Sequence, residues 1–397
     1  MELLVELYDR NNNLGNLLAA RAFGPARLVF LYDPARDGDG ERAETKLAAL
    51  ERSLRQPCPH TRFETMPVSY QDPASIEAAC ESLAGQGGAV FDLSGGNDLA
   101  AAVVSGYAAK QAFPRFTIDP KSRSIFDLGG AADCAAAFVF PKLTIAELAA
   151  ANGVSVNGNM HRPPAPERFA GILQFFRLTA RDPKGWRQFC NYLQEITNME
   201  NRDSQGRILV DAPAMVQSSR HKNLHLDPEF ARPAARLGFL ERYRAEGGRV
   251  RFCYPDAAAC RYMITQGVWL EMFLYITAAQ LGQFDECKMS LLFDWNGRDR
   301  EAGNVVNEID VVLMRGFTPL FISCKTSVPA TDDLNEILLY TRRFGGSHAR
   351  AALATTAAAK QIPLSVKNRA AEMDVLLLAK ESLSLRRLEA QLRSVLP

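Results

Sequence analysis

The first 130 residues alternate regularly between strand-like and helix-like patterns, and this alternation constrains the fold more than any other feature. The strand-like runs are apolar, and the segments between them repeat apolar residues at helical spacing. Such alternation predicts a parallel sheet with helices on both faces. The strand-like runs span 3–8, 26–32, 61–68, 88–96 and 113–119, and the helix-like segments span 41–54, 72–84 and 97–111.

Length and charge limit the classes to which the protein can belong. A chain of 397 residues is expected to form two or three domains. Its hydrophobic content of 47% and charged content of 23% are ordinary for a soluble globular protein. The formal net charge is only +1, so binding to nucleic acid would need a local basic patch.

The sequence shows no pattern for membrane insertion or export. Its apolar runs are far shorter than a membrane span, and the N-terminal MELLVELYDR lacks the basic start and apolar run of a signal peptide. The eight cysteines include no Cys-x-x-Cys pair, which argues against a zinc ribbon. We therefore expect a cytoplasmic protein with free thiols and no membrane partner.

A change in composition over residues 131–165 predicts a domain boundary. This stretch is rich in alanine and then in turn-forming residues, and it ends VNGNMHRPPAPE. A helix with Thr144 as its cap is expected inside it, over 141–148. The predicted domains are an α/β domain over 1–150, a helical connector over 160–255 and a third domain over 256–397.

The expected connector is basic. Between Arg220 and Arg251 the sequence has eight Lys or Arg against four Asp or Glu, and GGRVRFCY at 247–254 is typical of a hairpin strand. Helices followed by a basic strand suggest a winged-helix module. A helical linker with a solvated basic face explains the same residues equally well, so both interpretations stay open.

The third domain is predicted to follow the order α-β-β-β-α-β. One long helix, RYMITQGVWLEMFLYITAAQLG, ends at Gly282, and a second helix begins near Thr331 as its cap. His221 and His225, four residues apart in the connector, lie in a basic turn-like stretch and are expected on the surface rather than on a metal. The strands of the third domain are expected at 289–295, 305–314, 320–325, 349–356 and 374–379.

Two strands of this domain carry charged residues inside apolar runs. Side chains alternate across a strand, so Glu308 and Asp310 share one face, opposite Ile309, Val311 and Leu313. On the next strand Ser323 and Lys325 share a face. Charges at such positions are costly unless they are paired or bind a metal. The short connection between the strands therefore predicts that the carboxylates and the ammonium group converge.

A further carboxylate, Glu271, lies within the apolar helix GVWLEMFLY and is expected at the edge of the core. Carboxylates on a strand, a neighbouring lysine and a helical glutamate together suit metal-assisted cleavage of a phosphodiester. The carboxylates would hold Mg²⁺ or Mn²⁺, and the lysine would orient water or stabilise the transition state. A buried ion pair between Lys325 and Asp310 is the structural alternative.

These residues resemble the PD-(D/E)xK restriction-endonuclease-like fold. More narrowly, GVWLE, NEIDVV, FISCKT and FGGSHARAALAT together are similar to CRISPR-associated effector nucleases that join a Rossmann-like CARF domain to this nuclease domain. The resemblance follows the whole chain in order, and its C-terminal motifs are the more specific ones. It implies a CARF sensor and a nuclease domain with Asp310, Glu271 and Lys325 in the catalytic site, on either side of the helical, winged-helix-like connector suggested above.

The position two residues before the lysine departs from the family pattern. That pattern has Asp or Glu there, whereas this chain has Ser323, a poorer metal ligand. The backbone carbonyl of Cys324 could still bind the ion. Glu308, or Glu336 on the following helix, could supply the missing charge, because Glu336 shares a helical face with Asp333 and Tyr340.

A glycine turn at residues 91–98, FDLSGGND, joins a strand to a helix in the first domain. Glycines allow close backbone approach to phosphate, and a helix start offers free amides. The loop DRNNN at 9–13 follows the first strand and should lie beside it, because ligands bind at the carboxyl ends of parallel strands. A simple helix-start turn is the alternative. The candidate ligand-binding residues are Asp9, Arg10, Asn11, Asn12, Asn13, Ser94, Gly95, Gly96, Asn97 and Asp98.

The resemblance implies a sensor that grips a cyclic oligoadenylate, here expected to be cyclic tetra-adenylate, across a homodimer interface. Ligand binding would then activate Mn²⁺- or Mg²⁺-dependent cleavage of RNA or DNA in antiviral defence. A second interpretation comes from Ser323, which suggests a degraded nuclease site. In that case the protein would be a ligand-responsive transcription regulator that binds DNA through its connector.

Overall fold

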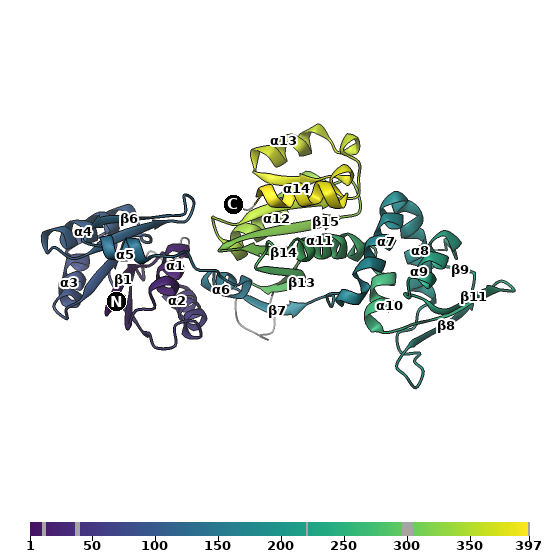
Figure 1. Ribbon diagram of the computed structural model, residues 1–397, viewed down its shortest axis with the longest axis horizontal. Coiled ribbons are helices and arrows are strands. Elements are labelled where there is room, and N and C mark those ends of the chain that lie inside the picture. Colours follow the sequence, from purple (N-terminus) through teal and green to yellow (C-terminus); the bar gives the residue numbers. More distant parts are fainter. Residues whose placement is uncertain (10–12, 36–39, 220, 296–304, 396–397) are drawn as a thin grey trace.

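The computed structural model describes residues 1–9, 13–35, 40–219, 221–295 and 305–395. Three parts follow one another along its length (Figure 1). The N-terminal sheet lies at one end, the C-terminal sheet lies in the middle, and residues of the expected connector lie at the other end. None of the described helices combines the length and the apolar character that a membrane crossing needs.

The N-terminal part is a six-stranded sheet with the order β3-β2-β1-β4-β5-β6. Strands β1 to β5 run parallel, and helices cover both faces, as the alternation predicted. All five residues of β1 are buried, which explains its unbroken apolar run except for Glu6. The elements are β1 (Leu3–Leu7), α1 (Leu14–Phe23), β2 (Arg27–Tyr32), α2 (Gly40–Arg55), β3 (Arg62–Pro67), α3 (Pro73–Ala84), β4 (Ala89–Asp92), α4 (Asp98–Lys110), β5 (Arg115–Asp119) and β6 (Ser124–Gly129).

The last strand of this sheet was not predicted from the sequence. Strand β6 pairs antiparallel with β5, and the two form a hairpin whose turn is Pro120–Arg123. Its sequence does not alternate strictly between apolar and polar residues, and its apolar Phe126 and Leu128 are exposed. The hairpin reaches the C-terminal part, where the Arg123 guanidinium lies over the Phe317 ring at 5.1 Å.

The segment predicted as a domain boundary is ordered into helices and a strand. It contains α5 (Ala132–Ala137), α6 (Ile145–Ala151) and β7 (Ser155–Asn159). Thr144 forms a capping box with Glu147, as expected for the cap of this helix. Strand β7 pairs antiparallel with β13 and is therefore the edge strand of the C-terminal sheet.

The connector has more strand than its mostly helical prediction allowed. Helices pack against a three-stranded antiparallel sheet of order β11-β12-β8, and β9 pairs with β10. The chain enters and leaves this part at adjacent points: the Tyr262 hydroxyl donates to the Arg162 carbonyl at 2.6 Å, and Arg168 pairs with Asp256 at 2.7 Å. The elements are η1 (Pro166–Arg168), α7 (Phe169–Arg181), α8 (Pro183–Ile196), β8 (Ile208–Pro213), β9 (Met215–Gln217), β10 (Asn223–His225), α9 (Pro228–Arg236), β11 (Glu241–Glu246) and β12 (Arg249–Tyr254).

The C-terminal part is a second six-stranded sheet with the order β17-β16-β15-β14-β13-β7. Helices α11 and α14 contribute to the core on one face, and α12 and α13 to the core on the other. The predicted α-β-β-β-α-β order is present from α11 to β16, and the chain continues through α13, β17 and α14. The elements are α10 (Ala257–Ile264), α11 (Val268–Leu281), β13 (Glu286–Asp294), β14 (Val306–Arg315), β15 (Thr318–Lys325), α12 (Thr331–Gly345), β16 (Arg350–Thr355), η2 (Ala359–Gln361), α13 (Leu364–Glu372), β17 (Val375–Leu378), η3 (Lys380–Ser382) and α14 (Leu385–Val395).

Two helix predictions in this part need correction. The single long helix predicted before Gly282 is two helices, α10 and α11. At the break, side chains from outside α10 donate hydrogen bonds to backbone carbonyls at the end of α10. The Trp269 indole donates to the Tyr262 carbonyl at 2.8 Å, and Gln194 of α8 donates to the Ile264 carbonyl at 2.6 Å. Thr331 is the first residue of α12 rather than its cap, since Ala330 takes the cap position.

Candidate functional site

Three carboxylates meet beside β14, a central strand of the C-terminal sheet. One ligand oxygen from each of Glu271 on α11 and of Glu308 and Asp310 on β14 lies within 4.8 Å of the others. Carboxylate oxygens are the ligands that Mg²⁺ and Mn²⁺ prefer. The predicted convergence of these residues is therefore present, and their donor set fits a hard divalent cation.

An irregularity in the sheet shapes this cluster. Ser290 of β13 has a left-handed backbone (φ 49°), and the register of β13 on β14 is the same on both sides of it, with Met289 opposite Val311 and Leu291 opposite Ile309. The expected alternation fails here, because Ile309 packs in the core on the α12 side whereas Val311 packs in the core on the α11 side. Strict alternation over residues 308–313 was therefore wrong, although the carboxylates still converge.

Burial makes the carboxylate cluster costly without a cation. Burial, followed by the neighbouring Asp310, raises the pKa of Glu271 well above its ordinary value, and the Ser290 hydroxyl donates to Glu271 at 2.9 Å. Burial likewise raises the pKa of Asp310 to about 6, against the lowering effect of the Cys324 amide. A bound divalent cation would offset both the repulsion and the lost hydration.

Lys325 forms ion pairs with helix α12 rather than with Asp310. Its ammonium nitrogen lies 3.0 Å from Asp333 and 3.5 Å from Glu336. Burial opposes the charged form of Lys325, but the hydrogen bond that it donates to Asp333 and the nearby carboxylates raise its pKa above the ordinary value. The structural alternative, a buried ion pair between Lys325 and Asp310, is therefore not what forms. Instead, the ion pairs with Asp333 and Glu336 hold the ammonium group beside the carboxylate cluster.

Strands β14 and β15 separate at the site. Their pairing ends at Val311 and Ile322, and a cleft of about 80 Å³ opens beyond it. The Cys324 amide donates to Asp310 at 2.5 Å, and the Cys324 carbonyl faces the same edge of its strand, because the two groups of one strand residue point the same way. Ser323 lines the cleft together with Glu308, Asp310, Lys325 and Glu336.

His161 is a neighbour of the cluster that the sequence interpretation did not include. It follows β7, and its Nδ1 is buried without a hydrogen-bond partner among the described residues. Burial lowers its pKa, and the Glu308 carboxylate acts against that shift, which places the ring within electrostatic reach of the site. Its position depends on β7 joining the sheet, and that strand carries no strong sequence pattern.

The second candidate site lies at the switch point of the N-terminal sheet. The chain leaves the neighbouring strands β1 and β4 into helices on opposite faces, so their carboxyl ends form the usual ligand crevice of an open α/β sheet. Asp9 and Asn13 follow β1, and the glycine turn follows β4. The Asn13 amide donates to the Ala151 carbonyl, so this side chain is held by the fold. Arg10, Asn11 and Asn12 lie outside the described residues.

The glycines of the turn are required by the fold itself. A Cβ atom on Gly95 would lie 2.1 Å from the Leu7 carbonyl oxygen, and Gly96 has φ +77° with the Leu7 Cβ at 2.8 Å. The polar residues of the turn also have structural bonds. The Ser94 hydroxyl accepts the Ile118 amide at 2.7 Å, and the Asn97 side chain caps α4 through the Ala100 amide at 2.8 Å. Asp98 is exposed in the first turn of α4.

Two acids lie side by side beneath this turn. Glu6 of β1 and Asp92 of β4 are register partners, and both are fully buried. Burial raises the pKa of Asp92 to about 6, and burial together with Asp92 raises that of Glu6 well above its ordinary value. Asp92 accepts the Ser94 amide at 2.8 Å and thereby anchors the glycine turn to the sheet.

The basic residues of the connector divide into paired and unpaired groups. Arg249 and Arg251 on β12 both pair with Asp211, at 2.7 and 3.0 Å. Arg242 and Arg244 on β11 are exposed and have no carboxylate partner within the described residues. His221 and His225 are both exposed, as expected for surface residues.

Comparisons with known proteins agree with this architecture. Residues 256–389 match the family model described as "Card1-like, endonuclease domain". The protein VC1899 from Vibrio cholerae is similar over 99% of this chain and 98% of its own, with 16% identity and a TM-score of 0.74. Can2 from Sulfobacillus thermosulfidooxidans, solved with cyclic tetra-adenylate, is similar over 99% and 98%, with 18% identity and a TM-score of 0.67. A search of curated protein sequences finds no match.

The two likenesses extend over almost the full length of both solved chains, so the whole architecture is shared. The expected α/β fold class is confirmed. Residues 256–389 match a Card1-like endonuclease domain, as the resemblance implied, and the N-terminal part shares the fold of the same region in the two solved proteins.

Proposed function

We propose that this chain is a metal-dependent nuclease that cyclic oligoadenylate activates through a CARF-type sensor in its N-terminal part. The observation that carries this proposal is the cluster of Glu271, Glu308 and Asp310, whose oxygens lie within 4.8 Å, with Lys325 held beside it. The match of residues 256–389 to an endonuclease family supports the same activity.

The protein's own residues have distinct roles in this proposal. Glu271, Glu308, Asp310 and the Cys324 carbonyl would hold Mn²⁺ or Mg²⁺, which supplies a water of lowered pKa and neutralises charge on the phosphate. Lys325 would stabilise the negative charge that grows on the scissile phosphate. Asp333 and Glu336 fix the ammonium group of Lys325, and their ion pairs keep it protonated.

The sensor would control the nuclease through a symmetric homodimer. Cyclic tetra-adenylate, the ligand in the Can2 structure, has repeated phosphates that two copies of one glycine turn can bind. The candidate groups are the turn from Ser94 to Asp98 and the loop from Asp9 to Asn13. The ligand activates only if it binds the closed dimer more tightly than the open one.

A cleavage assay tests the proposal. Labelled RNA and DNA are incubated with Mn²⁺ or Mg²⁺, with and without cyclic tetra-adenylate. We expect activator-dependent cleavage, and Asp310→Ala and Lys325→Ala should each reduce it by about 100-fold or more. Ser365→Ala, an exposed change on α13, is the control. Cleavage at the wild-type rate in either site variant would show that the carboxylate cluster is not the nuclease site.

Ser323 and the exposed arginines favour a second candidate function. If the missing carboxylate inactivates the cluster, Arg242 and Arg244 could still bind DNA, and the protein would be a ligand-responsive regulator. Binding of duplex DNA that changes with cyclic tetra-adenylate, without cleavage at any metal concentration, would favour this function over the nuclease.

A further inference from the structure

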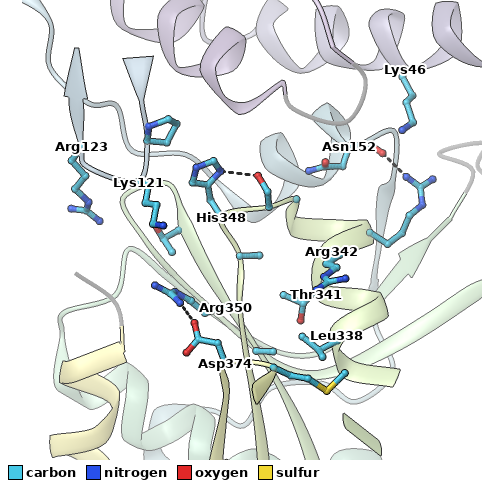
Figure 2. A pocket seen from close by; sticks show the side chains of 18 residues that line it. Lys46, Lys121, Arg123, Asn152, Leu338, Thr341, Arg342, His348, Arg350 and Asp374 are labelled. Carbon is cyan, nitrogen blue, oxygen red and sulfur yellow. Dashed lines mark hydrogen bonds and ion pairs between the residues drawn. The ribbon is translucent and has the colours of Figure 1, made fainter. Parts of the chain in front are cut away.

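A basic pocket lies between the sensor part and the endonuclease part. Its volume is about 830 Å³, within the usual range for small-molecule sites. It is lined by α2, the β5–β6 turn, the end of α12 and the start of β16, and basic side chains surround it (Figure 2). These side chains are Lys46, Lys121, Arg123, Arg342, Arg343 and Arg350.

Much of this positive charge is uncompensated. Asp374, the single carboxylate in the lining, pairs with Arg350, and Arg343 donates to the carbonyls of Asn152 and Trp295. Lys121, Arg123 and Arg342 have no carboxylate partner in the regions that the structure describes. The whole chain has a net charge of only +1, so this concentration of one sign is local and would attract a polyanion.

The pocket is separate from the nuclease cleft. Helix α12 presents Glu336 and Tyr340 to the cleft, whereas Leu338, Thr341 and Arg342 line the pocket. At 100° per residue these two sets lie on different flanks of the helix. The pocket is also separate from the glycine turn of the sensor, which contributes none of its lining residues.

The lining chemistry suits phosphate groups rather than bases. Arginine forks match phosphate oxygens and bind them through paired hydrogen bonds. The lining contains no Phe, Tyr or Trp on which a base could stack, and its one aromatic ring is that of His348. A ligand here would therefore be held mainly by its phosphates.

We propose that this pocket binds the phosphate chain of a free nucleotide such as a nucleoside triphosphate. Residues of both the sensor part and the endonuclease part would contact that ligand, so its binding would fix one part relative to the other. This would give the protein a second ligand input besides the one at the glycine turn. The proposal goes beyond the nuclease function and does not depend on it.

Calorimetry on the full chain tests the site, in EDTA so that metal-bound nucleotide cannot occupy the carboxylate cluster. ATP and tripolyphosphate are the probes, because tripolyphosphate has no base that could bind elsewhere. We expect Lys121→Ala/Arg342→Ala to weaken both probes by at least about tenfold, the loss of one charged hydrogen bond or more. Arg386→Ala, an exposed arginine on α14, is the matched control and should bind as the wild type does.

A second measurement uses the wild-type protein and so does not depend on a variant that folds. Burial lowers the pKa of His348. The positive charges of Arg350 and Lys121 lower this pKa further, whereas the Asp119 carboxylate raises it. Tripolyphosphate in the pocket should raise that pKa, which an NMR titration of the histidine rings detects. Two results would overturn the proposal: equal affinities for wild type and double variant, or binding by a single-stranded oligonucleotide alone, with no binding of either small probe.

Discussion

Ser323 decides how complete the candidate metal site is. The structure places Glu308 within the three-carboxylate cluster, so this residue can supply the charge that Ser323 lacks. We expect Glu308→Gln to raise the Mn²⁺ concentration needed for half-maximal cleavage by at least about tenfold. Losing a residue that only hydrogen-bonds to a metal ligand can already lower metal affinity by this factor. Ser323→Glu should bring little gain.

The same titration of cleavage against Mn²⁺ concentration also tests Glu336. This residue pairs with Lys325, so Glu336→Gln should lower the rate more than it changes the metal dependence. A large gain from Ser323→Glu, with both glutamine variants unchanged, would instead mean that the site is degraded.

Asp92 makes the stability of the sensor depend on pH. Its pKa rises from an ordinary 3.8 to about 6 in the folded chain, so the folded state holds more protons than the unfolded state between these values. Stability contributed through Asp92 is therefore present at low pH and falls as pH rises from about 4 to about 6. Asp92→Asn removes this ionisation but keeps an oxygen for the Ser94 amide.

We expect Asp92→Asn to raise the free energy of unfolding at pH 8 by about 1–3 kcal/mol, up to the value of a two-unit pKa shift. The variant should also partly flatten the pH dependence of the free energy of unfolding below pH 6. The flattening is incomplete because Glu6 still titrates. Urea denaturation between pH 4 and 8 measures both effects, with the exposed Asp98→Asn as control. A variant that is less stable than wild type at every pH would contradict the argument.

At the scale of elements, β11 is the strand on which a nucleic-acid contact can be tested. Arg242 and Arg244 are exposed without carboxylate partners in the described part, whereas Arg249 and Arg251 on β12 are already paired with Asp211. Changing the first pair to alanine should reduce the slope of log affinity against log salt by about 1.5, the release from two phosphates. Changing the β12 pair should reduce it less.

Fluorescence anisotropy with one oligonucleotide at several salt concentrations measures these slopes. Equal slopes for wild type and the Arg242→Ala/Arg244→Ala variant would leave the connector as a linker with a solvated face.

The sequence predicts an element well when its signal is local. Asp72 caps α3 and Thr144 caps α6, because a capping side chain bonds to amides only two or three residues away. The break between α10 and α11 depends instead on Gln194 and Trp269, which reach its carbonyls from outside α10. The left-handed backbone of Ser290 is equally hard to predict, because no local sequence pattern marks it. The carboxylate cluster could be predicted, but His161 could not.

At the scale of the whole molecule, β7 places the start of the C-terminal sheet earlier than the sequence suggested. A fragment of residues 160–397, cut at the predicted connector boundary, lacks this edge strand and leaves β13 unpaired on one side. A fragment of residues 141–397 keeps both α6 and β7. We expect the shorter fragment to melt several degrees lower and to aggregate more readily, as measured by circular dichroism and light scattering. Identical melting of the two fragments would support the boundary at residue 160.

The adjacent entry and exit of the connector have a consequence for protein engineering. The connector is inserted between β7 and α10. Its two ends are adjacent, because Arg168 pairs with Asp256 and the Tyr262 hydroxyl donates to the Arg162 carbonyl. The connector is thus a module nested inside the C-terminal part, and segments whose ends lie close together are the ones that proteins exchange most easily. Relatives of this chain could therefore exchange this module for another without rebuilding the sheet around it, and a designer could do the same.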